Sequence, residues 1–600
     1  MATVSNPTAA PEDVQRNKHP WLKFYDKGVA HAPSYPAIPL HRTLEDTAAR
    51  QPYTIATHFL GAELTYRQLN EQADHFAAYL QRLGVRKGER VALLLPNCPQ
   101  YVIAFYATLK IGAVLVPTNP LYVARELEHQ FKDAAVETVV CLDILYPRVA
   151  EIREHTSIKR VIVTGVRDYL SPIKQNLYFV HALHEKQMVA DYLPALGRVL
   201  YRRTREGQEH PLLEIPYGKA QDVYQFCAAI KQGGIPTYVD VQPDDLAVLQ
   251  YTGGTTGTSK GAMLLHRNLV ANTVQVHSWL SDRLPHEIFM AVMPFFHVYG
   301  LTVVMTHAVE CGATMVLMPR FVPADVVETI EKLKPTVFCG VPTMYIAINN
   351  FPEIGKRKLS SIRACLSGGA ALPIEVAEEF ERLTGGRLVE GYGLTEASPV
   401  THSNPIWGQR KAGSIGIPYP STEAKVVDMV SRAEQPLGEI GELAIRGPQV
   451  MAGYWQRAEE NAQVFSADGE WLYTGDMAVQ DEDGYFYIRD RKKDLIIASG
   501  YNIYPREIEE VLYQMPQVKE AVVVGVPDRY RGETVKAYLV LKDGETLSED
   551  AVISFCRASL ARYKVPHLVE FRPSLPKTLI GKFLRRLLVE EDVKKQAAAE

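Results

Sequence analysis

Length, composition and charge exclude several classes of protein. A chain of 600 residues with 46% hydrophobic and 22% charged side chains can bury more than one core, which excludes intrinsic disorder. The formal net charge of -4 is small for this length, so no overall field favours nucleic acid as a partner.

The cysteines and the apolar stretches indicate the cellular compartment of the protein. The seven cysteines lack CxxC spacing, which is typical of reduced, buried thiols. The most hydrophobic window, residues 301–319, contains His307 and Glu310, so we expect a core helix followed by a strand and not a membrane span. We expect a cytoplasmic protein without a targeting signal, with peripheral contact to the inner face of the membrane as an option.

Strand-like apolar runs alternate with helical patterns along the first part of the chain. Strands are expected at 90–95, 113–117 and 138–142, and helices at 66–83 and 100–110. The same alternation of strand and helix patterns is found at 289–301, 313–318, 323–332 and 336–339. Such alternation predicts a mostly parallel α/β fold, here with two α/β subdomains.

The pattern of expected elements changes toward the C-terminus. Short strands separated by turns begin near residue 413 and predict a small β-rich lobe. A compact α+β unit, 495–600, is expected after a boundary near Asp490, which leaves 1–489 as the large N-terminal domain. Residues 167–240 are irregular and longer than an ordinary connection, so we interpret them as an elaboration.

The loop at residues 251–261, YTGGTTGTSKG, carries the first chemical signal. It follows a strand-like run and precedes a helix expected near His266. Its glycines let the backbone curl, and its hydroxyl and amide donors can surround phosphate oxygens. A Walker loop requires GK followed by Ser or Thr, whereas Lys260 follows Ser259 and precedes Gly261, which excludes that class.

The loop resembles the signature of adenylate-forming enzymes, the superfamily of acyl-CoA synthetases, peptide-synthetase adenylation domains and firefly luciferase. Three further segments agree in order and spacing, so the resemblance covers nearly the whole chain: YGLTE at 392–396, YTGD at 473–476 and GK at 581–582. It implies a site for ATP and AMP formed by Thr252, Gly253, Gly254, Thr255, Thr256, Gly257, Lys260, Gly369, Ala370, Glu390, Gly391, Tyr392, Gly393, Thr395, Glu396, Asp476, Arg491 and Lys582.

The chemistry of these side chains fits the roles that the resemblance implies. Glu396 can hold Mg²⁺ through oxygen, and Tyr392 offers a flat face to adenine. Asp476 can accept from ribose hydroxyls. Each residue also has a plain structural alternative: a solvated glutamate at a helix start, a core tyrosine and a turn aspartate.

The resemblance assigns catalysis to Lys582, together with Glu396 and Thr252. A lysine on a loop can neutralise the charge that builds up when a carboxylate approaches an anionic α-phosphate. The alternative is a solvated basic cluster.

The charged run at 490–494 resembles the family hinge, with Lys493 as its pivot and Arg491 near the ribose. The implied mechanism has two half-reactions. The carboxylate and ATP first give acyl-AMP and pyrophosphate. The mobile C-terminal domain, 495–600, then turns and presents Ser499, Gly500 and Tyr501 to coenzyme A, whose thiolate displaces AMP.

Residues 389–399 and 471–505 are very similar to the signature of bacterial fatty-acyl-CoA synthetases, which implies a medium- or long-chain fatty acid as substrate. The presumed acyl pocket comprises His297, Val298, Gly300, Gly340 and Val341, although ordinary core packing explains each residue equally well. A shorter or aryl acid, a luciferase-like oxygenase and a catalytically silent fatty-acid-binding or membrane-associated protein stay open as alternatives.

Two further expectations concern partners. Residues 191–205 combine apolar positions at helical spacing with four arginines, a pattern that permits contact with anionic lipid but is more typical of a helix packed on the protein's own surface. The sequence leaves the oligomeric state open, with a homodimer as one option.

Overall fold

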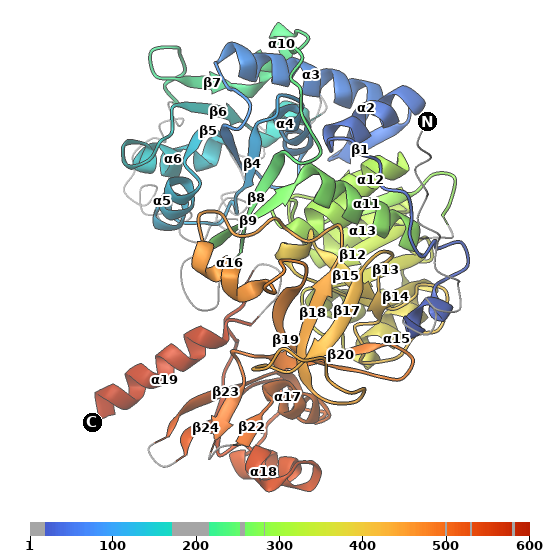
Figure 1. Cartoon of the computed structure of the whole chain (residues 1–600), viewed down its shortest axis with the longest axis vertical. Helices are drawn as coiled ribbons and strands as arrows, with labels where there is room; N and C mark the ends of the chain where they lie inside the picture. The colour runs from blue at the N-terminus through green and yellow to red at the C-terminus, as the bar shows by residue number, and fades with distance from the viewer. Residues whose placement is uncertain are drawn as a thin grey trace, which may run out of the picture.

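The computed structural model describes residues 19–170, 215–252, 259–280, 283–498, 501–528, 531–578 and 583–599. Two large sheets with their helices form the body of the molecule, a small sheet lies below them, and a C-terminal domain lies at the opposite end from α3 (Figure 1).

The first large sheet has seven strands in the order β7-β6-β5-β3-β4-β8-β9. All neighbours pair in parallel except β8 and β9, which are antiparallel. The strands are β3 (Arg90–Leu94), β4 (Val114–Pro117), β5 (Val136–Leu142), β6 (Arg160–Thr164), β7 (Val223–Gln225), β8 (Leu246–Thr252) and β9 (Lys260–Leu265). Its helices are α3 (Tyr66–Arg82), α4 (Pro99–Lys110), α5 (Ala124–Asp133), α6 (Tyr146–Ile152) and α10 (Phe226–Gln232).

The second large sheet has nine strands in the order β16-β15-β14-β13-β12-β10-β11-β1-β2. The strands are β1 (Ile55–Phe59), β2 (Ala62–Thr65), β10 (Ile288–Ala291), β11 (Thr314–Leu317), β12 (Val337–Gly340), β13 (Ala364–Ser367), β14 (Arg387–Gly393), β15 (Val400–Ser403) and β16 (Ile417–Pro418). Its helices include α2 (His41–Arg50), α11 (His266–Trp279), the π-helix η5 (Tyr299–Thr306), α12 (His307–Cys311), α13 (Pro323–Leu333), α14 (Pro342–Asn349) and α15 (Ile374–Thr384).

Helix α4 joins the two large sheets. It begins with Pro99, and every residue of the helix is buried, as expected for a helix that is apolar around its circumference. The Tyr101 hydroxyl donates to the carbonyl of Phe295 at 2.9 Å, and the Asn97 amide donates to the carbonyls of Ala291 and Met293. These bonds tie the first subdomain to the chain that leaves β10.

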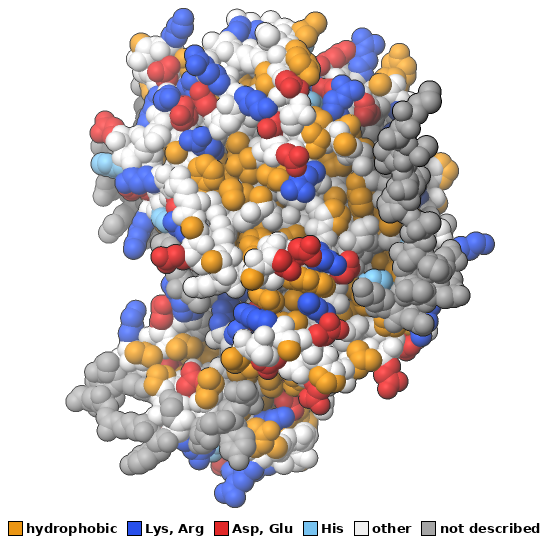
Figure 2. Space-filling view, viewed as in Figure 1, with side chains coloured by type: hydrophobic (Ala, Val, Ile, Leu, Met, Phe, Trp, Pro, Cys, Tyr) orange, Lys and Arg blue, Asp and Glu red, His pale blue; other side chains and the backbone are white. Residues whose placement is uncertain are grey.

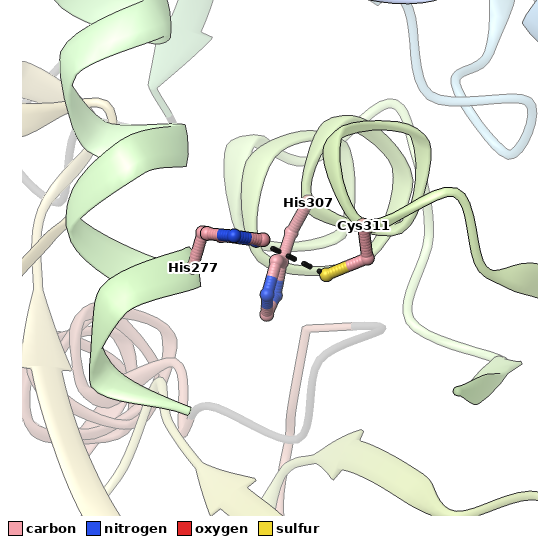
Figure 3. A group of neighbouring side chains, drawn as sticks. All are labelled: His277, His307 and Cys311. Carbon is pink, nitrogen blue, oxygen red and sulfur yellow. Dashed lines mark hydrogen bonds between the residues drawn. The ribbon is translucent and has the colours of Figure 1, made fainter. Parts of the chain in front are cut away.

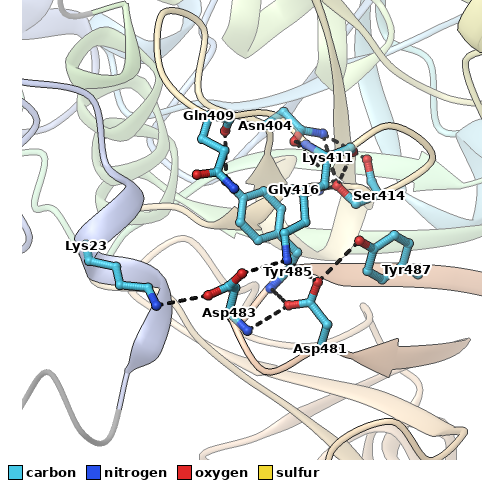
Figure 4. A network of polar contacts seen from close by, with 10 residues as sticks. All are labelled: Lys23, Asn404, Gln409, Lys411, Ser414, Gly416, Asp481, Asp483, Tyr485 and Tyr487. Atoms are coloured by element: carbon cyan, nitrogen blue, oxygen red, sulfur yellow. Dashed lines mark hydrogen bonds and ion pairs between the residues drawn. The ribbon is translucent and has the colours of Figure 1, made fainter.

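The β-rich lobe is a four-stranded antiparallel sheet, β17 (Glu423–Val427), β18 (Gly441–Arg446), β19 (Leu472–Gln480) and β20 (Phe486–Arg491). A polar network fastens the turn between β19 and β20 to the loop after β15 (Figure 4). The Lys411 ammonium lies 2.6 Å from Asp481 and 3.0 Å from Asp483, which also pairs with Lys23. The network therefore positions two strands that carry predicted nucleotide residues.

The C-terminal domain has its own sheet and its own hydrophobic clusters. Its strands are β21 (Ile496–Ala498), β22 (Tyr501–Ile503), β23 (Val518–Asp528), β24 (Gly532–Leu541) and β25 (Leu568–Phe571), and its helices are α17 (Pro505–Tyr513), α18 (Glu549–Ser559) and α19 (Arg585–Ala599). The main cluster of the body runs from Trp21 to Phe486, whereas those of the C-terminal domain lie between Ile496 and Leu588. In the space-filling view the outline narrows between the two parts (Figure 2).

The predicted fold class is confirmed, and the structure adds elements that the sequence analysis did not predict. Strand β9 follows the glycine-rich loop, so the loop connects two antiparallel strands and not a strand and a helix. Strand β22 and helix α19 were not predicted, and α19 projects away from the body (Figure 1). Within the described ranges, no helix is long and apolar enough to cross a membrane.

Candidate active site

Several predicted site residues lie at one edge of the nine-stranded sheet. Strands β10, β12, β13 and β14 are parallel, so their carboxyl ends meet at the same edge. His297 follows β10, Gly340 ends β12, Gly369 follows β13 and Tyr392 lies at the end of β14. In open α/β sheets this edge is where ligands bind.

Tyr392, Asp476 and Arg491 form a hydrogen-bonded cluster at this edge. The Tyr392 hydroxyl donates to Oδ2 of Asp476 at 2.5 Å, and Nε of Arg491 lies 3.2 Å from Oδ1. Asp476 and Arg491 are register partners on β19 and β20. Burial, with the neighbouring Asp476 charge, raises the pKa of Tyr392 above its ordinary value, so the phenol stays a donor.

A cavity of about 250 Å³ opens beside this cluster. It is lined by Thr474, Gly475, Asp476, Arg491, Lys492 and Lys493. Acceptor oxygens and cationic groups therefore face the same space, a combination that suits a sugar hydroxyl beside a phosphate. The predicted ribose residues and the predicted pivot line one cavity.

Glu396 is held by a residue that the sequence analysis missed. The Tyr454 hydroxyl donates to Oε1 of Glu396 at 2.6 Å, and the Lys260 ammonium lies 5.4 Å from the centre of the Tyr454 ring. Lys260 also pairs with Glu460 at 3.4 Å. Tyr454 thus brings together the carboxylate and the lysine that the resemblance assigns to the ATP site.

The backbone around Tyr454 explains this arrangement. Ala262 on β9 forms a bridge with Tyr454, and the Met263 amide donates to the carbonyl of Gly453 at 2.8 Å. The Met451 amide donates to the carbonyl of Glu396 at 2.8 Å. Residues 451–455 therefore join β9 to the short 3₁₀ helix of Thr395–Ala397, which carries Glu396.

The glycine-rich loop is described only at its ends. Thr252 and Lys260 are register partners on β8 and β9. The Tyr251 hydroxyl donates to Asp133 at 2.6 Å and anchors the start of the loop. The remaining predicted residues of the loop, Gly253, Gly254, Thr255, Thr256 and Gly257, lie outside the described residues.

Three other predicted residues also lie outside the described residues: Lys582, Ser499 and Gly500. Tyr501 is described as the first residue of β22, which pairs with β21. Lys493 is exposed between Arg491, where β20 ends, and Ile496, where β21 begins.

Close contacts explain the glycines of β14. A Cβ on Gly391 would lie 2.7 Å from the Leu366 side chain, and one on Gly393 would lie 2.2 Å from the carbonyl oxygen of Pro399. Gly369 has a φ of +82°, and both it and Ala370 are exposed after β13. Glycines in β14 therefore allow the neighbouring chain to approach closely. Gly369 and Ala370 leave exposed backbone beside the cluster of Tyr392, Asp476 and Arg491.

Glu390 lies where the body meets the C-terminal domain. Its carboxylate is buried and accepts from the Leu372 amide at 3.2 Å. Burial raises its pKa to about 7, opposed in part by the charge of Arg506 on α17. A charge of the C-terminal domain therefore acts on this buried carboxylate of the body.

Asp490 makes the direct link between the two parts. Its Oδ2 accepts from the Arg506 amide in the first turn of α17 at 2.9 Å. Burial raises the pKa of Asp490 to about 6, partly offset by Arg585, whose guanidinium binds Glu509 at 2.7 Å. A carboxylate at a helix N-terminus is favourable, so Asp490 holds α17 against the end of β20.

The predicted acyl-pocket residues are packed into the core. Val298 and Val341 are each 1% exposed. A Cβ on Gly300 would lie 2.2 Å from the Pro294 carbonyl, and one on Gly340 would contact the Tyr345 ring. His297 is half-buried, with its Nδ1 accepting from the Tyr299 amide at 3.2 Å.

The structure also has a second, apolar cavity of about 30 Å³. It is lined by Val276, Trp279, Leu280, Val303, His307, Val337, Cys339, Ala364, Cys365, Leu366, Ile406 and Tyr419. Its lining does not include the predicted pocket residues. Several of its residues belong to β12, β13, α11 and η5, which also bound the candidate site.

Sequence reasoning missed Tyr454 and Arg506, and it included Thr474 and Lys492 only as members of a motif. Tyr454 and Glu396 are 58 positions apart, and no local pattern links them. Thr474 stands inside the YTGD segment, so that segment already pointed to it, and Lys492 stands inside the charged run. Only the packing of α17 reveals Arg506.

Comparison with known proteins agrees with this geometry. The family model described as AMP-binding enzyme matches residues 44–455, and that described as AMP-binding enzyme C-terminal domain matches residues 507–582. The chain is 46% identical over 581 residues to a protein of Bacillus subtilis (strain 168) named long-chain-fatty-acid–CoA ligase, covering 96% of this chain and 99% of that relative.

Two solved structures are also similar. ATP-bound MatB from Rhodopseudomonas palustris has 29% identity and a TM-score of 0.78, with 93% of this chain and 99% of that chain covered. The anthranilate CoA ligase AuaEII in complex with anthranoyl-AMP has 28% identity and a TM-score of 0.78, with 95% and 99% covered.

Proposed function

Because this chain belongs to the family of AMP-binding enzymes, we propose that it joins a long-chain fatty acid to coenzyme A through an acyl-adenylate, consuming ATP and releasing AMP and pyrophosphate. The observation that carries the proposal is the cluster of Tyr392, Asp476 and Arg491 beside the 250 Å³ cavity. The Bacillus subtilis relative supports the choice of acid and thiol.

The first half-reaction is the attack of a carboxylate oxygen on the α-phosphate of ATP, with pyrophosphate as the leaving group. Asp476 accepts from the ribose hydroxyls, and Arg491 holds the Asp476 carboxylate in place. Tyr392 stacks on adenine. Lys582 is the cation that approaches the reacting phosphate and lowers the repulsion between two anions.

The residues around Glu396 fit Mg²⁺, which prefers oxygen ligands. Glu396 supplies a carboxylate oxygen, and the Tyr454 hydroxyl fixes its direction at 2.6 Å. When bound, the ion neutralises charge on the phosphates. Lys260, which lies over the Tyr454 ring, adds a second positive charge on the same side.

In the second half-reaction the thiolate of coenzyme A attacks the acyl carbonyl and AMP leaves. We assign residues 490–494 as the hinge of this step, with Lys493 as the pivot. Lys493 is exposed next to the end of β20, so rotation there leaves the sheet pairing of Asp476 and Arg491 intact. Ser499, Gly500 and Tyr501 face coenzyme A after the rotation.

The acyl chain is proposed to enter past His297, beside Val298, Gly300, Gly340 and Val341. All but His297 are buried against η5 and β12 in this structure, so the tail requires these side chains to move apart. Apolar walls of this kind suit an aliphatic chain.

A panel of acids tests the proposal. Pyrophosphate release is measured with ATP, Mg²⁺ and acids from acetate to palmitate, followed by thioester formation when coenzyme A is added. We expect both products with long-chain acids. Absence of pyrophosphate with every acid would favour a silent fatty-acid-binding protein, and preference for a short or aryl acid would correct the substrate class.

Lys582→Ala separates the two half-reactions. We expect it to reduce acyl-AMP formation severely and to leave thioester formation from pre-made acyl-AMP largely unchanged, because the lysine acts only during adenylation. Equal loss in both reactions would contradict its assignment.

Peripheral membrane contact by residues 191–205 stays a prediction, since this segment lies outside the described residues. Sedimentation with anionic vesicles at low and high salt tests it, because salt screens surface charge. A variant with the four arginines changed to glutamine should lose sedimentation; equal behaviour of the two proteins would exclude the contact.

A further inference from the structure

A cluster of two histidines and one cysteine lies outside the site described above. His277 is on α11, whereas His307 and Cys311 are the first and last residues of α12 (Figure 3). One ring nitrogen of each histidine and the sulfur of Cys311 all lie within 4.8 Å of one another. It is the one group of at least three His, Cys, Asp or Glu side chains with such spacing among the described residues.

We propose that His277, His307 and Cys311 bind a divalent cation of borderline softness, of which Zn²⁺ is the type. Two imidazoles and a thiolate are ligands that this cation prefers, and three protein ligands leave a fourth position for water. His277 and Cys311 are only partly buried, so water can reach that position.

The distance between His277 and Cys311 is close to the one that the ion needs. Zinc bonds of about 2.0 Å to nitrogen and about 2.3 Å to sulfur place neighbouring tetrahedral ligands about 3.5 Å apart. Nδ1 of His277 lies 3.2 Å from Sγ of Cys311. His307 and Cys311 are four residues apart, which puts them on one face of α12, and Figure 3 shows His277 facing them from α11.

His307 supplies independent evidence for a ligand. Its side chain is 3% exposed, and its Nδ1 pairs with the carbonyl of Val303 at 3.3 Å. This bond places the proton on Nδ1 and leaves Nε2 as a lone-pair donor, and no described residue forms a hydrogen bond with Nε2. A histidine that bonds a backbone carbonyl through one nitrogen is typical of metal ligands.

One cation opposes binding. The Arg283 guanidinium contacts Nε2 of His277 and lies near Cys311. Arg283 is exposed, so it can swing away, but it competes with the ion for the same imidazole. Arg50 adds positive charge near His277, whereas Glu287 and Glu310 add negative charge near Cys311. Removing Arg283 should therefore strengthen metal binding.

The full chain, stripped with a chelator, is titrated with Zn²⁺ against a chromophoric competitor. We expect one equivalent in the wild type, at least about tenfold weaker binding in Cys311→Ser and in His307→Ala, and tighter binding in Arg283→Gln. Cys227→Ser is the matched control, because Cys227 is also partly buried but lies on α10, and it should bind as the wild type does.

Co²⁺ provides a readout that does not depend on activity or on the variants folding. A thiolate-to-cobalt charge-transfer band should appear in the wild type and in Cys227→Ser, whereas the oxygen ligands around Glu396 cannot produce it. Absence of the band in the wild type, or zinc binding by folded Cys311→Ser as tight as that of the wild type, would overturn the proposal.

Discussion

At the scale of single residues, the candidate site depends on hydroxyl groups that orient carboxylates. Tyr392 donates to Asp476, and Tyr454 donates to Glu396. Both carboxylates therefore present a fixed direction to a ligand before it binds, which lowers the cost of ordering them in the complex. Neither tyrosine needs to touch the reacting phosphate to affect the rate.

Tyr454→Phe tests this view of Glu396. A hydrogen bond to a charged group contributes about 2 kcal/mol, so its loss corresponds to a roughly thirtyfold change in affinity or rate. We expect the Mg²⁺ concentration for half-maximal pyrophosphate release to rise, with much of the activity recovered at saturating Mg²⁺. The exposed Tyr238→Phe is the control. An unchanged Mg²⁺ dependence would contradict the role of Tyr454.

Glu390→Gln tests the buried carboxylate. Its pKa rises from 4.5 to about 7 in the folded state, so the folded protein binds more protons than the unfolded chain between these values. Stability therefore falls as pH rises through this window, by about 3 kcal/mol when complete. The variant keeps an acceptor for the Leu372 amide without the charge.

We expect wild type and Glu390→Gln to melt at similar temperatures at pH 4.5 and the variant to melt higher at pH 8. Glu375→Gln, an exposed glutamate, should show no such divergence. If the difference between wild type and Glu390→Gln did not grow with pH, the carboxylate would not be held at a raised pKa.

At the scale of elements, the predicted hinge lies where β20 ends. The Lys492 amide donates to the Gly475 carbonyl at 2.9 Å, and the Asp494 amide donates to the Arg491 carbonyl at 3.0 Å. The chain around Lys493 is thus fixed on both sides, and a change in its own backbone dihedrals can move β21 and all that follows.

Lys493→Pro tests the pivot, because proline fixes φ. We expect acyl-AMP formation to survive and thioester formation from pre-made acyl-AMP to fall at least about tenfold. Lys493→Ala, which removes the charge and keeps the backbone free, should retain both reactions. Thioester formation unchanged in the proline variant would exclude this pivot.

Sequence periodicity recovered most long elements but few short ones. The alternation between 90 and 142 predicted β3, α4, β4 and β5 to within a few residues. Helix α19 has little apolar periodicity, and β22 has only three residues, so neither leaves a pattern long enough to recognise. Strand β9 begins with Lys260 and Gly261, residues that are typical of a loop in the sequence. Only their pairing with β8 identifies them as part of a strand.

At the scale of the whole molecule, the body and the C-terminal domain have separate hydrophobic clusters and meet through polar groups. Asp490 accepts from the Arg506 amide, and Glu390 lies near the Arg506 side chain. Polar contacts exchange for water at lower cost than apolar ones, so such an interface suits a domain that must detach and redock.

Calorimetry tests this division. We expect two thermal transitions, the larger from the body and the smaller from the C-terminal domain, because their hydrophobic clusters are separate among the described residues. ATP with Mg²⁺ should raise the larger transition more, since most of the nucleotide residues lie in the body. One symmetrical transition with equal calorimetric and van't Hoff enthalpies would contradict two separable units.

The sequence by itself determined the α/β class, the family and the nucleotide motifs, because backbone periodicity and glycine-rich loops are local properties of the chain. Only the tertiary structure decided which side chains become partners. Tyr392 meets Asp476 across 84 positions and Tyr454 meets Glu396 across 58, while His277 meets Cys311 across 34. Sheet order and helix packing set such pairs, and no spacing along the chain encodes them.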